Sequence, residues 1–372
     1  MTHSLDTLAA PALGDFARRQ LLRLCEVAEL PPADAVSYAK ILTMALGPLA
    51  VRPLDEPPPY PSFLSDDHTP VEYSFSFQQG TAPVLRVLLE PGWGADTMAR
   101  NGLAGLHAVH GMARAWGFAT DRLDELTDLF FPDRPKGPLA LWCALELRAG
   151  GVPGVKVYLN PAASGRKRSL ATVREAMRRL GHGEAFAALP PADGFPFLAL
   201  DLGDWEEPRV KVYLRHDGLS ATEAAGLSRM PDGPAPESLG EFFRTVAGLD
   251  PSGTDDGIPL TGRPVLSCHA FTDGTSGLPS GFTLHIPVRD YVRHDGESLE
   301  RALSVLARHG LDPAPLLGSL SAVTSRLPEE GIGLIAYLAL VHQHGSAPRV
   351  TAYISSEAYA VRPPLRVPRR RI

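Results

Sequence analysis

The chain has 372 residues, of which 44% are hydrophobic and 21% are charged, proportions that are typical of a packed globular protein. Glycine (35 residues) and proline (36 residues) make up about a fifth of the chain, below the share of ~25–30% that indicates low complexity or disorder. The formal net charge is −6 and lysine and arginine form no extended basic block, which argues against a nucleic-acid-binding protein.

Helical and strand patterns follow one another in five rounds, and each round predicts two helices and then two strands. The predicted helices cover residues 15–29 and 33–47, 97–116 and 120–130, 169–180 and 182–189, 220–228 and 237–249, and 297–309 and 311–323. The predicted strands cover residues 70–78 and 84–90, 139–148 and 154–160, 195–203 and 208–215, 264–272 and 281–288, and 332–342 and 348–355.

Short turns rich in glycine and proline join the paired strands at residues 149–154, 203–208 and 345–348. Strands joined so tightly must be antiparallel, and ten consecutive strands leave exposed edges unless the sheet closes. The sequence therefore predicts an α+β fold, in which five ααββ units form a ten-stranded antiparallel barrel inside a ring of helices. We expect one domain over residues 1–372, with a flexible N-terminus of about 1–12 and a basic C-terminal tail of about 363–372.

The predicted strands have one aliphatic face and one polar or aromatic face. In residues 71–77, for example, Glu72, Ser74 and Ser76 alternate with apolar side chains. The helices need an apolar surface to pack on, so we expect the aliphatic face outside the barrel. The polar and aromatic face then lines a lumen, which indicates a ligand.

The second strands of the five units read LRVLLEP, VKVYLNP, VKVYLRH, FTLHIPV and VTAYISS. One equivalent position holds Arg86, Lys156, Lys211, Thr283 and Thr351, and the position two residues later holds Leu88, Tyr158, Tyr213, His285 and Tyr353. Arg209 shares the face of Lys211. Lysine and arginine bind a diphosphate through charge-assisted hydrogen bonds, and aromatic faces stabilise a carbocation. The combination predicts ionisation of an allylic diphosphate.

Together with the run SFLSDDHTPVEYSFSF (62–77), these segments resemble the dimethylallyltryptophan synthase family, the indole prenyltransferases of αββα barrel fold. The resemblance points to the bacterial, actinomycete-like members, and especially to those that prenylate tryptophan at indole C6. The resemblance implies an enzyme that transfers a dimethylallyl group from dimethylallyl diphosphate to C6 of L-tryptophan and releases diphosphate. It also implies that no cofactor is needed, and that neither Mg²⁺ nor Ca²⁺ is required.

The resemblance implies a role for each matching residue. Glu72 would accept the indole N–H, and Phe63 and Leu64 would contact the amino acid through their backbone. The diphosphate would be bound by Arg86, Lys156, Arg209, Lys211, Thr283, Tyr158, Tyr213 and Tyr353. The three tyrosines would also shield the allyl cation, and His285 and Tyr337 would complete that lining.

The sequence departs from the family pattern at three places. Thr283 and His285 stand where the family commonly has glutamine and tyrosine. Arg148 stands at the position of the family's proton-accepting lysine, although arginine keeps its proton and is a poor base. Either Arg148 only positions groups and Glu146 on the same face takes the final proton, or pyrophosphate itself accepts it. The family arginine that holds the tryptophan carboxylate has no counterpart near residues 194–197.

Other interpretations keep the barrel but change the reaction or its metal requirement. The acceptor could be a tryptophan-containing cyclic dipeptide, an indole alkaloid or a tyrosine, and a carrier of an anionic hydrophobic molecule would not need Glu72. The acidic run Asp124, Glu125 and Asp128 resembles the Mg²⁺ motif of all-helical prenyltransferases, but it lies in an amphipathic helix without a second acidic cluster. We therefore interpret it as a solvated helix face.

The cellular context follows from cysteine usage and from the termini. Cys25, Cys143 and Cys268 form no CxxC pair, which argues against a disulfide framework and a zinc site and fits the cytoplasm. The N-terminus lacks the pattern of a signal peptide, and no apolar run reaches the ~18 residues that a membrane span needs. We expect no membrane or nucleic-acid partner, and a monomer or homodimer.

Overall fold

The computed structural model describes residues 10–203, 208–272 and 277–365, and its ten described strands close into an antiparallel barrel. The strands neighbour one another in the order β1-β10-β9-β8-β7-β6-β5-β4-β3-β2, so the first strand pairs with the last. They are β1 (Val71–Gln78), β2 (Val84–Leu89), β3 (Leu141–Glu146), β4 (Gly154–Leu159), β5 (Gly194–Leu202), β6 (Val210–His216), β7 (Val265–Phe271), β8 (Gly281–Ile286), β9 (Ile335–Gln343) and β10 (Arg349–Ser355). The predicted barrel of five ααββ units is confirmed.

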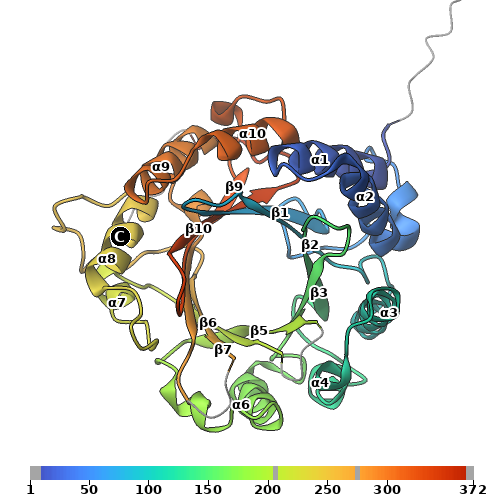
Figure 1. Cartoon of the computed structure of the whole chain (residues 1–372), viewed down its shortest axis with the longest axis horizontal. Helices are drawn as coiled ribbons and strands as arrows, with labels where there is room; N and C mark the ends of the chain where they lie inside the picture. The colour runs from blue at the N-terminus through green and yellow to red at the C-terminus, as the bar shows by residue number, and fades with distance from the viewer. Residues whose placement is uncertain (1–9, 204–207, 273–276, 366–372) are drawn as a thin grey trace, which may run out of the picture.

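Helices surround the barrel on all sides, as the view along its axis shows (Figure 1). They are α1 (Leu13–Val27), α2 (Pro32–Leu46), α3 (Met98–Trp116), α4 (Asp121–Asp124), α5 (Thr127–Phe130), α6 (Ser169–Arg179), α7 (Ala221–Ala225), α8 (Pro236–Ala247), α9 (Asp295–Arg308) and α10 (Ala314–Val323). None of these helices is long and apolar enough to cross a bilayer.

One helix in each of three units is shorter than the apolar spacing predicts. Instead of one helix over 120–130 there are α4 and α5, separated where the Thr127 hydroxyl donates to the Asp124 carbonyl at 2.9 Å. Residues 184–188 form a 3₁₀ helix because Gly183 precedes them and Leu189, which is followed by Pro190, is extended. Helix α7 ends at Ala225, before Gly226. The periodicity locates these segments but overestimates their helical length.

The hydrophobic core fills the space between the barrel and the helices. The outward side chains of β1 and β3 are buried there, and the Tyr73 hydroxyl donates to the Ala17 carbonyl of α1 at 3.0 Å. Replacing a fully buried side chain such as Phe75 by alanine would destabilise the fold by about 3–5 kcal/mol. The aliphatic faces therefore point outward, as predicted, and the polar faces line the lumen.

The barrel closes where β1 pairs with β10. Ser74 pairs with Tyr353 in the strand register, and inside the lumen the Thr351 hydroxyl and Ser76 hydroxyl lie 3.1 Å apart. On the outside, the Gln20 amide of α1 donates to the carbonyls of Val323 and Ser356 at 3.0 and 2.8 Å. The two ends of the chain are thereby held together by side chains as well as by strand pairing.

Some sequence expectations concern residues that the structure does not describe. The flexible N-terminus of about 1–12, the basic tail of about 363–372 and the turn at 203–208 lie partly or largely outside the described residues. Within the described part, Ala12 forms an isolated bridge with Pro53.

Candidate active site

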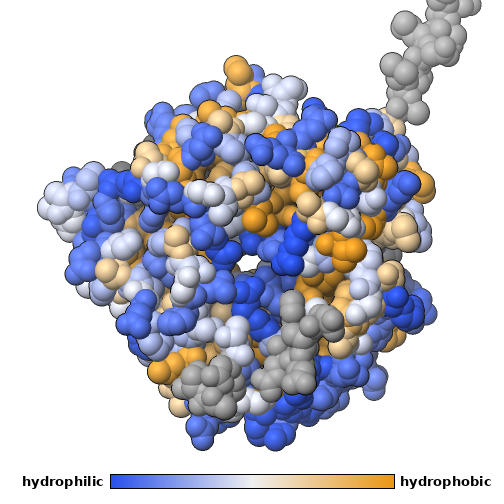
Figure 2. Space-filling model, in the orientation of Figure 1, coloured by the Kyte–Doolittle hydropathy of each residue, from blue (hydrophilic) through white to orange (hydrophobic). Residues whose placement is uncertain are grey.

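The lumen is organised in two levels, because the second strands of the five units run in the same direction and place equivalent residues at similar heights. The first level is mostly aromatic and holds Leu88, Tyr158, Tyr213, His285 and Tyr353. The second level is two residues earlier along each strand and holds Arg86, Lys156, Lys211, Thr283 and Thr351. On the face shown in Figure 2, hydrophilic residues gather around the central opening of the ring.

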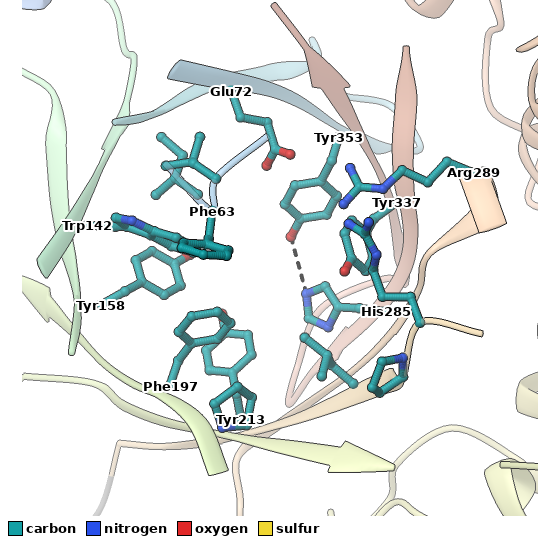
Figure 3. Close-up of a pocket in the computed structure, with 16 residues that line it drawn as sticks. Phe63, Glu72, Trp142, Tyr158, Phe197, Tyr213, His285, Arg289, Tyr337 and Tyr353 are labelled. Carbon is teal, nitrogen blue, oxygen red and sulfur yellow. Dashed lines mark hydrogen bonds between the residues drawn. The ribbon is translucent and has the colours of Figure 1, made fainter. Parts of the chain in front are cut away.

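The aromatic level encloses a cavity of about 250 Å³ (Figure 3). Neighbouring rings form a continuous wall, with centroids 5.3 Å apart for Trp142 and Phe197 and 5.8 Å apart for Tyr158 and Tyr213. Such rings bind a flat aromatic substrate and present π faces that stabilise a cation. The residues that line the cavity include Phe63, Leu64, Glu72, Leu88, Trp142, Tyr158, Phe197, Tyr213, Arg263, His285, Arg289, Tyr337 and Tyr353.

His285 and Tyr353 form a polar pair within this wall. A hydrogen bond joins His285 Nε2 and the Tyr353 hydroxyl at 3.2 Å (Figure 3). Burial, and then the positive charge of Lys211, lower the pKa of His285 to about 3. The imidazole is therefore neutral at physiological pH, so it lines the cavity without repelling a cation.

Glu72 is the carboxyl group of the aromatic cavity. It comes from β1, lies between Leu88 and Ser355 in the strand register, and is 5% exposed. Burial, with a smaller contribution from Asp66, raises the pKa of Glu72 to about 8, and Arg263 acts in the opposite direction. The carboxyl group of Glu72 therefore keeps its proton at neutral pH, and a hydrogen-bond donor on a ligand would favour its ionised form.

Glu90 does not line the aromatic cavity but holds two parts of its wall in place through hydrogen bonds. Its carboxyl group accepts hydrogen bonds from the Ser62 hydroxyl at 2.7 Å, the Asn101 amide at 2.7 Å and the Trp142 indole N–H at 3.3 Å. Glu90 therefore holds the Trp142 ring and the segment that carries Phe63 and Leu64. The sequence analysis did not identify Glu90, since a single glutamate after a strand gives no distinguishing pattern.

The second level is a cluster of cations with two carboxylates between them. Arg86 Nη2 lies 2.8 Å from Glu146 Oε2, and Lys156 Nζ lies 3.1 Å from Asp201 Oδ1. Arg209 Nε donates to Asp201 Oδ2 at 2.6 Å. These residues line a smaller cavity of about 80 Å³. The structure thus brings together the three predicted diphosphate ligands Arg86, Lys156 and Arg209, and it adds Asp201 as their counter-ion.

Lys211 completes the cluster of cations. Burial, and then repulsion by Lys156, hold the pKa of Lys211 well below its ordinary value of 10.5, although Asp201 acts in the opposite direction. A bound anion would reverse this effect and favour the ammonium form. Thr283, another predicted diphosphate ligand, is buried on β8 at the same level. The predicted diphosphate ligands Tyr158, Tyr213 and Tyr353 line the aromatic cavity.

The sequence analysis missed Arg349, the first residue of β10. Arg349 Nη2 and Arg209 Nη1 both donate to Gln343 Oε1 at 3.3 Å, so Arg349 belongs to the same cluster. It precedes Thr351 by two residues, just as Arg209 precedes Lys211, and therefore shares its face. Extending the strand alignment by one inward position would have found it.

Glu146 and Arg148 lie beside the cations and line the smaller cavity, whereas Glu72 lines the aromatic one. Arg148 Nη2 lies 2.8 Å from Glu146 Oε1, so Glu146 bridges Arg148 and Arg86. Burial opposes ionisation of Glu146, but the two guanidinium groups outweigh it and lower its pKa to about 2. A carboxylate held in this way is a weak base.

The acidic run on the surface makes ion pairs outside the barrel. Asp124 pairs with His110 at 2.8 Å, Glu125 with Arg122 at 3.3 Å, and Asp128 with Arg179 at 2.6 Å. Throughout the described ranges, no group of three or more His, Cys, Asp or Glu side chains is arranged to hold a metal ion. The run belongs to the outer ring of helices and not to the lumen.

A closed barrel with an aromatic cavity above a cluster of cations defines an aromatic prenyltransferase of αββα type. The family model described as tryptophan dimethylallyltransferase matches residues 18–314, which is well over half of the chain. The protein belongs to the tryptophan dimethylallyltransferase family and is an enzyme of that class.

Solved structures of the family are similar to the chain over almost its whole length. The prenyltransferase PriB, in a ternary complex with L-tryptophan and dimethylallyl thiolodiphosphate, is 61% identical, with a TM-score of 0.93 over 96% of this chain and 100% of that chain. The 5-dimethylallyl tryptophan synthase from Streptomyces coelicolor is 62% identical (TM-score 0.91, 96% of this chain, 98% of that chain). The 6-dimethylallyltryptophan synthase from Micromonospora olivasterospora is 38% identical (TM-score 0.85, 95% of this chain, 99% of that chain).

Proposed function

We propose that the enzyme transfers the dimethylallyl group of dimethylallyl diphosphate to the benzene half of the indole ring of free L-tryptophan. The observation that carries the proposal is that the two levels of the lumen are adjacent. The aromatic cavity with Glu72 lies next to the cluster of cations along the barrel axis. The solved relatives that hold tryptophan together with a thiolo analogue of the donor support the same pair of substrates.

The cations at the second level would bind the diphosphate and stabilise it as a leaving group. When the bond between C1 of the prenyl group and the diphosphate oxygen breaks, both electrons go to the oxygen and an allyl cation remains. Arg86, Lys156, Arg209 and Lys211 offset the developing negative charge. Because Asp201 and Glu146 occupy part of this cluster, the donor must share these cations with two carboxylates.

The aromatic level would then hold the cation and the indole face to face. Tyr158, Tyr213 and Tyr353 present their rings to the allyl cation, and each ring contributes roughly 0.5–2 kcal/mol of cation–π stabilisation. The indole N–H would donate to Glu72, which favours the carboxylate and stabilises positive charge in the ring as a carbon attacks. A new C–C bond forms, and loss of a proton from the same carbon restores aromaticity.

The final proton would go to the released pyrophosphate. An arginine side chain is a poor base, and Glu146 is held as a weak base by Arg86 and Arg148. Pyrophosphate lies next to the arenium intermediate in this arrangement and is the stronger base. Arg148 and Glu146 would therefore position the cations that bind the diphosphate, and they would not take part in proton transfer.

The position of attack on the indole ring is inferred from the sequence motifs and from the named relatives. The sequence motifs favour C6, which agrees with the name of the relative that is 38% identical, whereas the relative that is 62% identical is named as a 5-synthase. Both are positions of the benzene half, and we propose that attack occurs there through C5 or C6.

The cations of the lumen would replace a metal ion in this reaction. They are sufficient in number to balance the two or three negative charges of a diphosphate, and the acidic run around Asp124 is engaged in surface ion pairs. We therefore propose that the enzyme turns over without Mg²⁺ or Ca²⁺.

One assay tests the proposal directly. The purified enzyme is incubated with dimethylallyl diphosphate and a panel of L-tryptophan, a tryptophan-containing cyclic dipeptide and L-tyrosine, and the products are assigned by mass spectrometry and NMR. We expect dimethylallyl-tryptophan substituted at C5 or C6. Binding of both ligands without any product would instead indicate the carrier, and a preference for the cyclic dipeptide or tyrosine would reject free tryptophan.

A further inference from the structure

Asp201 is a carboxylate that lies among the cations of the second level. It is on the inward face of β5, opposite Lys156 in the strand register. Its Oδ1 lies 3.1 Å from Lys156 Nζ, and its Oδ2 accepts a hydrogen bond from Arg209 Nε at 2.6 Å. Only 13% of its side chain is exposed, and it lines the smaller cavity together with both cations. A negative charge therefore lies in the part of the lumen that the diphosphate is proposed to occupy.

The cations around Asp201 keep it ionised. Burial opposes the ionisation of Asp201, but Lys156, and then Lys211 and Arg209, outweigh burial and lower its pKa below the ordinary 3.8. Asp201 therefore compensates part of the positive charge of the cluster when no diphosphate is bound. It also repels a diphosphate, because like charges in a partly buried site interact more strongly than in water. A neutral side chain at this position would leave one more positive charge for an anionic ligand.

The cations that bind the donor also bind the product. When the bond between C1 of the prenyl group and the diphosphate oxygen breaks, both electrons stay on the oxygen. The leaving group then carries one more negative charge until it takes up the arenium proton. Each charge-assisted hydrogen bond that stabilises this leaving group also holds pyrophosphate in the site. Product release can limit turnover in such an enzyme, so a site made of cations alone would bind the donor well but retain the product.

Asp201 gives Lys156 and Arg209 a counter-ion when pyrophosphate leaves. Lys156 and Asp201 lie opposite each other on neighbouring strands, so their ion pair needs no movement of the backbone. Without this carboxylate, departure of pyrophosphate would leave partly buried cations uncompensated, which costs free energy. Asp201 removes that cost and therefore lowers the affinity of the site for pyrophosphate.

We propose that Asp201 promotes product release, because it pairs with Lys156 and Arg209 in competition with pyrophosphate and so keeps the product affinity low enough for turnover. The inference rests on the proposed function, since it concerns the cations that were assigned there to the diphosphate. Asp201 acts through Lys156 and Arg209 and does not touch the reacting atoms. It is therefore a positioning residue, and its effect is on the departure of the leaving group.

The sign of one binding measurement tests the proposal. Asp201→Asn keeps the shape of the side chain and removes its charge. The dissociation constant of inorganic pyrophosphate, measured by calorimetry without turnover, should fall about tenfold, the scale of one charge-assisted hydrogen bond. If Asp201 only held Lys156 and Arg209 in place, the variant would bind pyrophosphate more weakly. A dissociation constant that is unchanged or higher would overturn the proposal.

Kinetics separates product release from the chemical step. With the enzyme in excess over dimethylallyl diphosphate, the single-turnover rate of Asp201→Asn should stay within about threefold of the wild type. In the steady state, the inhibition constant of pyrophosphate should fall about tenfold, in parallel with its dissociation constant. An equal loss of the single-turnover rate and of kcat would show that the variant damages the chemical step, and it would overturn the proposal.

Asp256→Asn is the matched control. Asp256 pairs with Arg244 Nη1 of α8 at 2.7 Å, and it lines neither of the two lumen cavities. The variant therefore loses the same charge and a similar ion pair outside the barrel. Its affinity for pyrophosphate and its kinetic constants should remain close to those of the wild type.

Two further measurements make the test independent of the stability of Asp201→Asn. Lys211→Met removes one positive charge from the cluster and so offsets the loss of the carboxylate. In that background, adding Asp201→Asn should again lower the dissociation constant of pyrophosphate, and an unchanged or higher value would overturn the proposal. A wild type that binds pyrophosphate more tightly than dimethylallyl thiolodiphosphate would overturn it without any variant.

The same titrations distinguish this inference from the proposed function. A wild type that binds neither pyrophosphate nor dimethylallyl thiolodiphosphate would reject the donor site and the inference with it. Binding by the wild type together with weaker binding by Asp201→Asn would reject only the role of Asp201. Tighter binding by Asp201→Asn would support that role even if no prenylated product formed.

Discussion

Replacing Glu72 by glutamine should make the protein less active and, in alkaline solution, more stable. Glu72 is 5% exposed, and its pKa is raised from the ordinary 4.5 to about 8, mainly by burial. A raised carboxyl pKa means that the folded chain holds a proton that the unfolded chain releases. The resulting stabilisation is complete below pH 4.5 and is lost as the pH rises through 8.

The size of the effect follows from the two pKa values. Each tenfold change in the protonation equilibrium corresponds to about 1.4 kcal/mol, so ionising Glu72 in the fold costs roughly 4–5 kcal/mol more than in the unfolded chain. The wild type should therefore lose free energy of unfolding on that scale between pH 5 and pH 9. Glutamine does not ionise, and Glu72→Gln should lack this part of the pH dependence.

Urea unfolding at pH 5, 7 and 9, followed by circular dichroism, measures the difference. The free-energy curves of the wild type and Glu72→Gln should diverge as the pH rises, whereas Glu300→Gln, an exposed position on α9, should follow the wild type. Parallel curves for the wild type and Glu72→Gln would refute the argument that Glu72 is buried without compensation. In the same preparations, kcat of Glu72→Gln should be lower by roughly 10²-fold or more, the scale of a positioned acid–base or oxyanion-type group.

Three further predictions concern the diphosphate cluster. Lys211→Met should raise the dissociation constant of dimethylallyl thiolodiphosphate about tenfold while tryptophan still binds, and an unchanged donor affinity would show that Lys211 does not contact the diphosphate. Glu146→Gln and Arg148→Lys should both keep activity within about tenfold of the wild type, because pyrophosphate takes the proton. Loss of turnover in Glu146→Gln with normal donor binding would instead identify Glu146 as the base. Turnover should persist in excess EDTA. A complete loss of activity that added Mg²⁺ restores would reject diphosphate binding by the side-chain cations alone.

Much of the barrel could be predicted because the two faces of its strands have opposite chemistry. The alternation of Glu72, Ser74 and Ser76 with large apolar residues already gives the side that each residue faces. The five-fold repeat then aligns Lys156 with Lys211 and Tyr158 with Tyr213, since equivalent strands must place equivalent residues at one height. Pattern and repeat together therefore locate both levels of the lumen.

Two of the residues that the sequence analysis missed lie where no strand or helix period applies. Arg289 is in a 3₁₀ helix and Arg263 in a loop, so neither spacing nor alternation indicates which way their side chains point. Asp201 is visible as an inward residue, but its pairing with Lys156 and Arg209 depends on the neighbouring strands and not on its own segment. Ion pairs across a sheet are set by register, which one sequence alone does not give.

The pairing of β1 with β10 determines when an active enzyme can first exist during synthesis. β1 leaves the ribosome early, but its second neighbour is the last strand of the barrel, so most of the chain must be made before that edge is covered. Until then, the nascent sheet has two open edges and its charged and aromatic faces are not yet enclosed, a state that favours aggregation. A polypeptide that stops before Arg349 is therefore not a smaller enzyme but an open sheet without an active site.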